Sequence, residues 1–258
     1  MRALVTGAGA RLGRAMALTL ADHGHDVAVH YASSAEGAEE TAALIRAKGR
    51  QAVTLQADLL MPEDVAGLVP AAAAGLGGPL TVLVNNASIF EHDDIHTATA
   101  DSWDRHMGSN LRAPLMLTQQ FAAQVPDPVT DDGGEPVAQG LVVNMLDQRV
   151  HKLTPEFMTY TLAKMGLWTL TRTAAQGLAP RVRVNGIGPG PTLRGSRQSE
   201  SHFAQQRAAT ILGRGADPAD ICNALVYLLG AKAVTGQMIA VDGGQHLGWQ
   251  TPDVLGLE

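Results

Sequence analysis

The chain of 258 residues is long enough for one large α/β domain or two small ones, and a hydrophobic fraction of 45% supports a sizeable core. The net charge of −6 comes from interspersed residues without a basic stripe, so nucleic acid is not an expected partner. A single cysteine, Cys222, permits neither a disulfide framework nor a cysteine-based metal site, and no metal is expected. No leader-like segment opens the sequence, and no apolar run approaches the roughly eighteen residues of a membrane span. We therefore expect a cytoplasmic protein.

Strand-like runs alternate with helical runs along the whole chain. The predicted strands are 3–7, 26–30, 52–56, 81–85, 141–144, 181–186 and 237–241, and the helical segments between them include 12–23, 35–48 and 101–125. Near-continuous apolar strands separated by helices indicate a parallel sheet covered on both faces. The pairs Thr154-Pro155 and Asp217-Pro218 each place a capping side chain before a proline, which predicts a helix start.

Two loops interrupt this alternation. Residues 125–140 are rich in Pro, Gly and Asp and are interpreted as a surface connection, whereas residues 188–201 follow the sixth predicted strand. Open α/β sheets bind ligands beyond the carboxyl ends of their strands, so we expect a substrate loop at about 190–210. No repeat or linker divides the chain. The fold expected over 1–258 is therefore a single Rossmann-like, doubly wound α/β domain of about seven strands.

A glycine-rich turn, TGAGARLGRA, follows the first predicted strand. Gly7, Gly9 and Gly13 allow a tight turn and a close approach of backbone N–H groups to a phosphate at a helix N-terminus. At this position in a β/α chain, the turn predicts a dinucleotide site. Arg11 could neutralise the pyrophosphate, reach into the active site, or remain a solvated residue of the first helical turn.

The end of the second predicted strand favours NADPH over NADH. An NAD-binding protein is expected to carry an acid there for the ribose 2′-hydroxyl, but none occurs before Glu36. Ser33 and Ser34 can donate hydrogen bonds to a 2′-phosphate instead, with possible help from His30. Asp58, after the third strand, suits the adenine amino group or a helix cap.

Tyr160 and Lys164 lie four residues apart in a helical pattern, so both project from one helix face. An ammonium group beside a phenol stabilises the phenolate, lowers the tyrosine pKa and prepares the residue for proton exchange. The Tyr-x-x-x-Lys spacing is common by itself, and its meaning depends on the rest of the sequence.

The sequence resembles the short-chain dehydrogenase/reductase family over essentially its whole length. The matching pieces occur in the family's order: TGAGARLG (6–13), ADL (57–59), NNAS (85–88), SNLRAP around Asn110, YTLAK (160–164), NGIGPG (185–190) and VDGG (241–244). The resemblance implies that Tyr160 donates the proton, Lys164 also holds the nicotinamide ribose, and Asn110 maintains a water-linked proton path. It places further cofactor contacts at Leu12, Tyr31, Leu59, Asn86, Ala87, Ser88, Pro189 and Gly190.

Asp147 departs from the common family pattern, which has a serine thirteen residues before the tyrosine. A serine donates to the oxygen of a carbonyl under reduction, whereas an ionised carboxylate only accepts. Two facing acceptors would cost about 1–3 kcal/mol, or about ten- to hundredfold in rate. Either Asp147 is neutral and donates, or the substrate presents N–H groups and its reducible bond is C=N.

Within the family, the chain resembles the pteridine reductases and dihydromonapterin reductases. NMLDQ, TGAGARLG, VHYASSA and NNASIF are similar to their motifs, with Asp147 at the serine position. The resemblance implies that Phe90 stacks on a pterin and that Arg11 contacts both pyrophosphate and pterin; a phenylalanine of the core is the alternative for Phe90. Substrate contacts are thus expected at Arg11, Ser88, Phe90, Asp147 and Tyr160.

The function expected from these features is NADPH-dependent reduction of a pterin or a dihydrofolate-like C=N substrate. The alternatives are a general carbonyl or 3-oxoacyl reductase and a non-catalytic NADPH-binding sensor. The family also implies a homotetramer. Arg194 and Arg197 could meet the acidic tail of a folate or lie in a solvated loop. Trp249 could approach a neighbouring subunit's site or pack at an interface.

Overall fold

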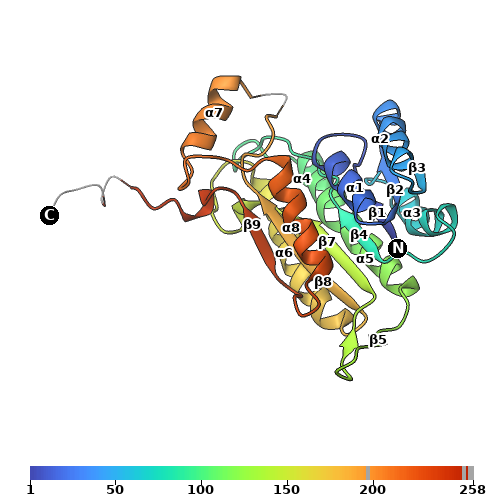
Figure 1. The fold of residues 1–258 in the computed structure, drawn as a ribbon. Coiled ribbons are helices and arrows are strands. Elements are labelled where there is room, and N and C mark those ends of the chain that lie inside the picture. The colour runs from blue at the N-terminus through green and yellow to red at the C-terminus, as the bar shows by residue number, and fades with distance from the viewer. Residues whose placement is uncertain (196–197, 252–253, 255–258) are drawn as a thin grey trace.

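A parallel sheet of seven strands forms the centre of the molecule (Figure 1). The computed structural model describes residues 1–195, 198–251 and 254. The strand order is β3-β2-β1-β4-β7-β8-β9, and every neighbouring pair is parallel. The strands are β1 (Arg2–Val5), β2 (Asp26–Tyr31), β3 (Ala52–Gln56), β4 (Val82–Asn85), β7 (Gly140–Met145), β8 (Val182–Pro189) and β9 (Met238–Val241). The predicted Rossmann-like α/β fold with about seven strands is confirmed.

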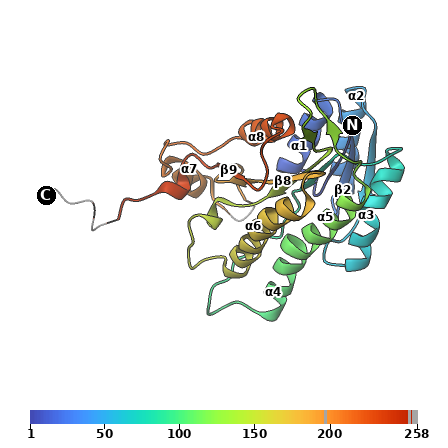
Figure 2. The same ribbon diagram turned by 90° about the horizontal axis from the view of Figure 1, so that it is seen from below.

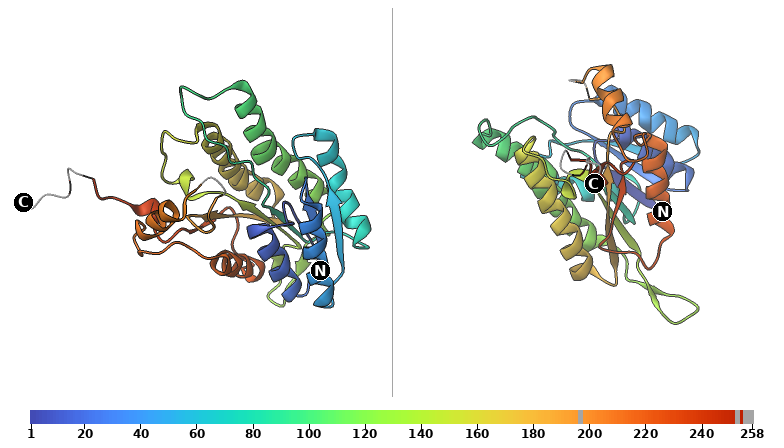
Figure 3. Two further views of the ribbon diagram at one scale, coloured as in Figure 1. Left: turned by 90° about the horizontal axis from the view of Figure 1, so that it is seen from above. Right: turned by 90° about the vertical axis from the view of Figure 1, so that its left-hand side faces the viewer.

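Helices cover both faces of the sheet, as the view in Figure 2 shows. One layer contains α1 (Arg11–Asp22), α2 (Ala35–Ala47) and α8 (Pro218–Gly230). The other contains α3 (Pro62–Gly75), α5 (Ala113–Gln124) and α6 (Met158–Leu178), with α4 (Ala100–Met107) packed against α6. The short helix α7 (Glu200–Ala208) lies outside both layers (Figure 3).

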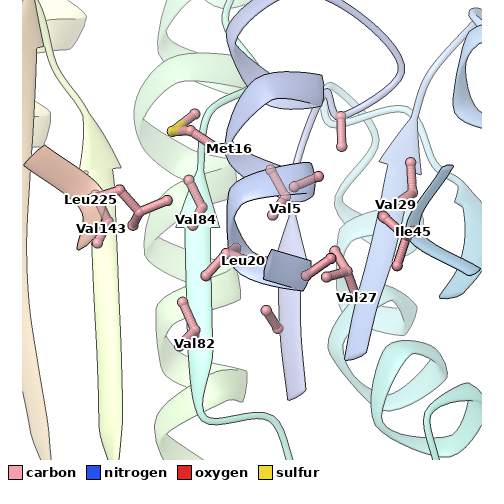
Figure 4. Close-up of a cluster of buried hydrophobic side chains, with 14 of the residues drawn as sticks. Val5, Met16, Leu20, Val27, Val29, Ile45, Val82, Val84, Val143 and Leu225 are labelled. Carbon is pink, nitrogen blue, oxygen red and sulfur yellow. The ribbon is translucent and has the colours of Figure 1, made fainter. Parts of the chain in front are cut away.

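The core is divided by the sheet into two apolar clusters. On the side of α1, α2 and α8, strand residues such as Val5, Val29 and Val143 pack against Met16 and Leu225 (Figure 4). Leu83, Val142 and Phe121 belong to the cluster on the opposite side. All six residues of β7 are buried, because adjacent side chains of a strand point to opposite faces and both faces are covered.

Two of the helix predictions differ from the structure, whereas the segments 12–23 and 35–48 agree with α1 and α2. The segment 101–125 is not one helix, because a π-helical turn at Gly108–Arg112 separates α4 from α5. Thr154-Pro155 does not begin a helix; α6 starts at Met158, after Phe157 in the left-handed conformation. The start of α8 at Pro218 is confirmed, with Asp217 and Asp220 forming a reciprocal capping box.

The loop 125–140 contains a small hairpin instead of an irregular connection alone. Its strands β5 (Val129–Thr130) and β6 (Pro136–Val137) pair antiparallel and are largely exposed. Two 3-10 turns, η2 (Gln148–Val150) and η3 (Gln245–Leu247), follow β7 and β9. Within 1–195, 198–251 and 254, no helix is long and apolar enough to cross a membrane. The same residues contain no group of three or more His, Cys, Asp or Glu side chains placed to hold a metal ion.

Candidate active site

The sequence motifs meet at the carboxyl edge of the sheet. After β1 the chain adds β2 and β3 on one side of that strand and then crosses over to add β4 on the other side. The direction of strand order therefore reverses between β1 and β4. Open α/β sheets bind ligands at such a switch point. The glycine turn follows β1, the segment 86–93 follows β4, and Asp147 follows β7.

The glycine turn is built around contacts that exclude larger side chains. Gly7 has a φ of +63°, and a Cβ added to Gly13 would lie 2.1 Å from the carbonyl oxygen of Gly7. The Asn86 side chain donates from Nδ2 to the carbonyl oxygens of Thr6 and Gly7 at 2.8 and 3.3 Å. This conformation leaves the start of α1 accessible to a phosphate, as a dinucleotide site requires.

His30 hydrogen-bonds to the backbone of the glycine turn and does not extend toward a phosphate. The backbone N–H of Gly7 donates to His30 Nδ1 at 3.0 Å, and Nε2 pairs with the carbonyl oxygen of Ala57 at 3.1 Å. Burial lowers the pKa of this imidazole. Both ring nitrogens are therefore occupied by backbone groups, and the structure does not favour the expected direct help to a 2′-phosphate.

The end of β2 leaves polar side chains open to solvent. Ser33 and Ser34 are exposed, and Ser34 is the residue before α2, whose N-terminus favours an anion. Tyr31 is half-buried at the end of the strand. This edge therefore fits a 2′-phosphate better than an unmodified ribose, because it offers hydroxyl and backbone donors.

Arg11 joins the glycine turn to the loop that follows β8. It is the first residue of α1, has an unusual φ of +53°, and donates to the carbonyl oxygens of Arg194 and Leu193 at 3.0 and 3.1 Å. The loop thus binds Arg11 through its backbone, while the exposed Arg194 side chain donates to the carbonyl oxygen of Gln198 at 3.3 Å. Arg197 lies outside the described residues.

The remaining expected cofactor positions follow the same edge. Asp58 Oδ1 accepts from the backbone N–H of Leu60 at 2.9 Å and shapes a turn, while Met61 is the residue that precedes α3, so Asp58 is not that helix's cap. Leu59 is buried beside this turn, and Leu12, Ala87, Pro189 and Gly190 are half-buried. Gly190 is tightly packed, because a Cβ there would lie 2.6 Å from the Cβ of Asp242.

The structure brings Asp147, Tyr160 and Lys164 together. The Tyr160 hydroxyl donates to Asp147 Oδ2 at 2.9 Å, and Asp147 Oδ1 accepts from the backbone N–H of Arg149 at 2.8 Å. Lys164 Nζ donates to the carbonyl oxygen of Met145, the last residue of β7, at 2.7 Å. Tyr160 and Lys164 share one face of α6, as their spacing predicted.

The electrostatics of this group differ from the expectation that Lys164 lowers the pKa of Tyr160. Burial, followed by the neighbouring Asp147 carboxyl, raises the pKa of Tyr160 well above its usual value. Burial also raises the pKa of Asp147 and lowers that of Lys164 to about 8. All three groups are thus shifted toward their neutral forms, so Asp147 can carry a proton under milder conditions than a solvated carboxyl.

Asn110 lies in the π-helical turn and fastens the segment that follows β4. Its Oδ1 accepts from the backbone N–H of Ile89 at 2.9 Å, and its Nδ2 donates to the Ile89 carbonyl oxygen at 2.8 Å. Single π-helical turns are frequently found at functional sites. Here the turn aims the buried carboxamide at the segment that carries Ser88 and Phe90.

Phe90 forms one wall of the site together with a residue that sequence reasoning missed. Its ring stacks on Phe157 with centroids 4.3 Å apart and planes 8° apart, and it meets the edge of Tyr160 at 4.7 Å. The side chain is 46% exposed, so the alternative of a core phenylalanine does not hold. The Arg149 guanidinium lies 4.8 Å from the Phe157 centroid. The scarcity of aromatics and the spacing of three residues before Tyr160 were the available signals for Phe157.

Other supporting residues carried no sequence signal of their own. Arg14 donates to the carbonyl oxygens of Gly9 and Gly37 at 3.0 Å and so ties the glycine turn to α2. Asp93 and His106 are buried near Tyr160 in a polar cluster that depends on long-range packing. Trp249 is 60% exposed, and neither of its two expected roles is tested by this single chain.

Comparison with known proteins identifies the family to which the chain belongs. A family model described as Enoyl-(Acyl carrier protein) reductase matches residues 7–246. Among curated relatives, a 3-oxoacyl-[acyl-carrier-protein] reductase FabG from Staphylococcus aureus is 32% identical over 95% of this chain and 98% of its own length. The chain belongs to the short-chain dehydrogenase/reductase family of NAD(P)-dependent oxidoreductases.

Two solved structures sharpen the comparison. FolM Alternative dihydrofolate reductase 1 from Brucella canis, complexed with NADP, is 43% identical with a TM-score of 0.90, covering 98% of this chain and 96% of that one. The landomycin C-6 ketoreductase LanV, with bound NADP and rabelomycin, is 32% identical with a TM-score of 0.83, covering 96% of each chain. The likeness is therefore greater to the dihydrofolate reductase than to the ketoreductase.

Proposed function

We propose that this protein is an NADPH-dependent reductase of pterins, acting on a dihydropterin such as dihydromonapterin or on a dihydrofolate-like C=N substrate. The observation that carries the proposal is the 2.9 Å hydrogen bond from the Tyr160 hydroxyl to Asp147 Oδ2. A carboxyl at this position can accept from a ring N–H or an amino group, and in its neutral form it can donate as well. A pterin offers such groups along one edge, whereas a simple ketone offers only an acceptor.

The site also suits a planar ring. Phe90 is 46% exposed beside Tyr160, and its stack on Phe157 holds the ring in one orientation. Aromatic faces bind flat heterocycles by stacking, which a short acyl chain cannot reproduce. Ser88 is exposed two residues before Phe90, and its hydroxyl donates to the carbonyl oxygen of Ile89 at 3.3 Å. The likeness to FolM supports the same substrate class.

NADPH is the proposed cofactor. The Gly7–Gly13 contact and the accessible start of α1 fit a pyrophosphate, and the exposed Ser33 and Ser34 fit a 2′-phosphate. Asn86, Ala87, Lys164, Pro189 and Gly190 belong to the same proposed surface, with the nicotinamide ribose near Lys164. NADP in the structures of FolM and LanV supports this assignment.

The chemistry divides between cofactor and protein. Bound NADPH supplies a hydride to a ring carbon of the substrate. Tyr160 and Asp147 supply the matching proton to the adjacent ring nitrogen, so that one C=N bond is reduced to CH–NH. Lys164, held by the Met145 carbonyl oxygen, keeps a positive charge near the phenol when it is protonated. Phe90 and Ser88 position the ring against this pair.

The decisive experiment compares NADPH oxidation with dihydrobiopterin, dihydromonapterin, dihydrofolate and an acetoacetyl thioester, each repeated with NADH. We expect turnover of at least one pterin or folate with NADPH and slower turnover with NADH. Turnover of the thioester alone would reject the pterin assignment. Light scattering on the same preparation tests the homotetramer that the family membership suggests.

A general carbonyl or 3-oxoacyl reductase is the second candidate. The likeness to FabG favours it, and the raised pKa of Asp147 would allow a neutral carboxyl to donate to a ketone oxygen as serine does in the family. A non-catalytic NADPH sensor is less well supported, because a sensor has no need for the Tyr160–Asp147 pair. It gains support only if NADPH binds and no substrate of the panel is reduced.

A further inference from the structure

In the segment 88–93 after β4, alternate residues are hydrogen-bonded to neighbouring elements, and the residues between them face the site. Ile89 is bound by the Asn110 carboxamide, the Glu91 N–H donates to His106 Nε2 at 3.2 Å, and Asp93 is bound by Ser102 and Thr159. The intervening residues contact the site instead. Ser88 is exposed, and Phe90 stacks on Phe157 and packs against Tyr160. The hydrogen-bonded residues therefore determine the position of Phe90, which forms one wall of the site.

Asp93 connects this segment to the start of the catalytic helix. Phe157, the residue before α6, provides no side-chain cap. Asp93 takes that role from another part of the chain: its Oδ1 accepts from the N–H of Thr159 at 3.1 Å, and its carbonyl oxygen accepts from the N–H of Met158 at 3.2 Å. These are the first two residues of the helix, and Tyr160 is the third. A carboxylate at a helix N-terminus is stabilised by the unpaired N–H groups there.

A hydrogen-bonded chain of three buried side chains completes the connection. Because the Glu91 N–H occupies His106 Nε2, the proton of the neutral imidazole is assigned to Nδ1, which donates to Thr159 Oγ1 at 2.7 Å. The Thr159 hydroxyl in turn donates to Asp93 Oδ2 in a short contact. His106, Thr159 and Asp93 are 0%, 3% and 2% exposed. Each buried polar atom named here has a partner, which makes this a rigid arrangement.

We propose that Asp93, Thr159 and His106 are positioning residues that fix the Phe90 wall relative to the Tyr160 hydroxyl. None of the three is placed against the substrate. Thr159 precedes Tyr160 in α6, Asp93 follows Phe90 by three residues, and the His106 ring packs 6.0 Å from the Tyr160 ring. The inference deepens the proposed function, since it assumes that Phe90 stacks on the substrate and Tyr160 delivers the proton.

The test compares substitutions on the two sides of Tyr160. Thr159→Val keeps the shape of the side chain and removes both of its hydroxyl hydrogen bonds. Thr161→Val is the matched control, because Thr161 is also buried and its hydroxyl has no hydrogen-bond partner among the described residues. Thr159→Ser restores the hydroxyl and should rescue the defect. His106→Phe retains the ring and is the second test should Thr159→Val fail to fold.

For Thr159→Val, we expect kcat/KM for the pterin to fall about ten- to hundredfold, because small misplacements of a reacting group have effects of that order. The Kd for NADPH should stay within about twofold of wild type, because the glycine turn and Ser33–Ser34 are not part of the cluster. Thr159→Ser and Thr161→Val should both stay close to wild type. Equal losses in Thr159→Val and Thr161→Val would overturn the positioning role.

A second readout separates this inference from the proposed substrate. Amide hydrogen exchange should accelerate over 88–93 and the first turn of α6 in Thr159→Val and His106→Phe, and not in Thr161→Val. If wild type reduces no pterin, the proposed function fails while the exchange data still decide whether the cluster fixes the wall. Unchanged exchange in both Thr159→Val and His106→Phe would overturn the positioning role of the cluster.

Discussion

The Tyr160 hydroxyl donates to Asp147 Oδ2 at 2.9 Å, and both groups are shifted toward their protonated forms. Burial is the main cause in each case, and the proximity of the two acids adds to it for Tyr160. The pair can therefore hold protons beside a substrate at a pH where a solvated carboxyl would be ionised. The raised pKa of Asp147, an unusual acid at the end of β7, therefore suits it to a part in proton delivery by a reductase.

Tyr160→Phe should abolish reduction while leaving NADPH binding nearly intact. The substitution removes the proposed proton donor and its bond to Asp147 but keeps the ring that packs against Phe90. A general acid contributes about 10²–10⁴-fold to a rate, so turnover should fall by that order. Steady-state assays and a fluorescence titration with NADPH measure the two effects. A variant that retained full turnover would show that Tyr160 is not the proton donor.

Asp147→Ser should change the preferred substrate. Serine has a single oxygen, which can donate to a carbonyl oxygen but lacks the second carboxyl oxygen that receives a ring N–H or amino group. We expect pterin reduction to fall about ten- to hundredfold, in line with a lost pairing of about 1–3 kcal/mol. Reduction of an acetoacetyl thioester should rise or stay unchanged. Pterin reduction that survives the substitution unchanged would contradict the role given to Asp147.

The raised pKa of Asp147 also predicts how activity depends on pH. A carboxyl that must be protonated to take part in proton delivery is active below its pKa, so turnover should decline as pH rises through that value. Asp147→Asn removes the titrating group, and its lower rate should lack this decline. The pH profiles of kcat for the two proteins, recorded with saturating NADPH, make the comparison. Identical profiles would assign the decline to another group.

Much of this architecture could be predicted from the sequence because it depends on local patterns. The strands read as apolar runs, the glycine turn follows the first strand, and the four-residue spacing of Tyr160 and Lys164 places both on one helix face. The His30 contacts and the π-helical turn around Asn110 could not be predicted. They depend on groups brought together across the sheet, and no local spacing encodes them.

The direction of the Tyr160 pKa shift was missed for a related reason. Lys164 is near in sequence, so its charge was expected to dominate, but burial and Asp147 decide the outcome. Desolvation is a property of the whole packed site and cannot be derived from spacing. Phe157 was missed similarly, because its stack on Phe90 joins two loops that are distant in the chain.

The glycine turn gives a prediction with a matched control. Gly13→Ala would place a methyl group 2.1 Å from the Gly7 carbonyl oxygen and 2.6 Å from Asn86 Nδ2, so the turn must open. NADPH affinity should fall by about tenfold or more, because each 1.4 kcal/mol of strain costs a factor of ten. Gly67→Ala is the control: it lies in α3, and its added Cβ would meet no atom within 4 Å outside its own stretch of helix. That variant should bind NADPH normally and gain up to about 1 kcal/mol in stability.

His25 predicts a loss of stability in mild acid. It is 2% exposed directly before β2, and burial lowers its pKa from 6.5 to about 4. Between these values the unfolded chain binds more protons than the folded one, so the free energy of unfolding rises with pH and falls as pH drops from 6.5 toward 4. Burial shifts the pKa values of His30 and His106 in the same direction, so they add to the effect.

His25→Gln should flatten this dependence by about 1–3 kcal/mol, an amount that reflects the size of the pKa shift. Urea unfolding at several values between pH 4 and 7 measures it, with the free energy of unfolding extrapolated to water. The variant His23→Gln tests the contribution of the neighbouring exposed imidazole, whose charge also lowers the pKa of His25. A slope that is equally steep in His25→Gln and wild type would assign the acid sensitivity to the other buried histidines.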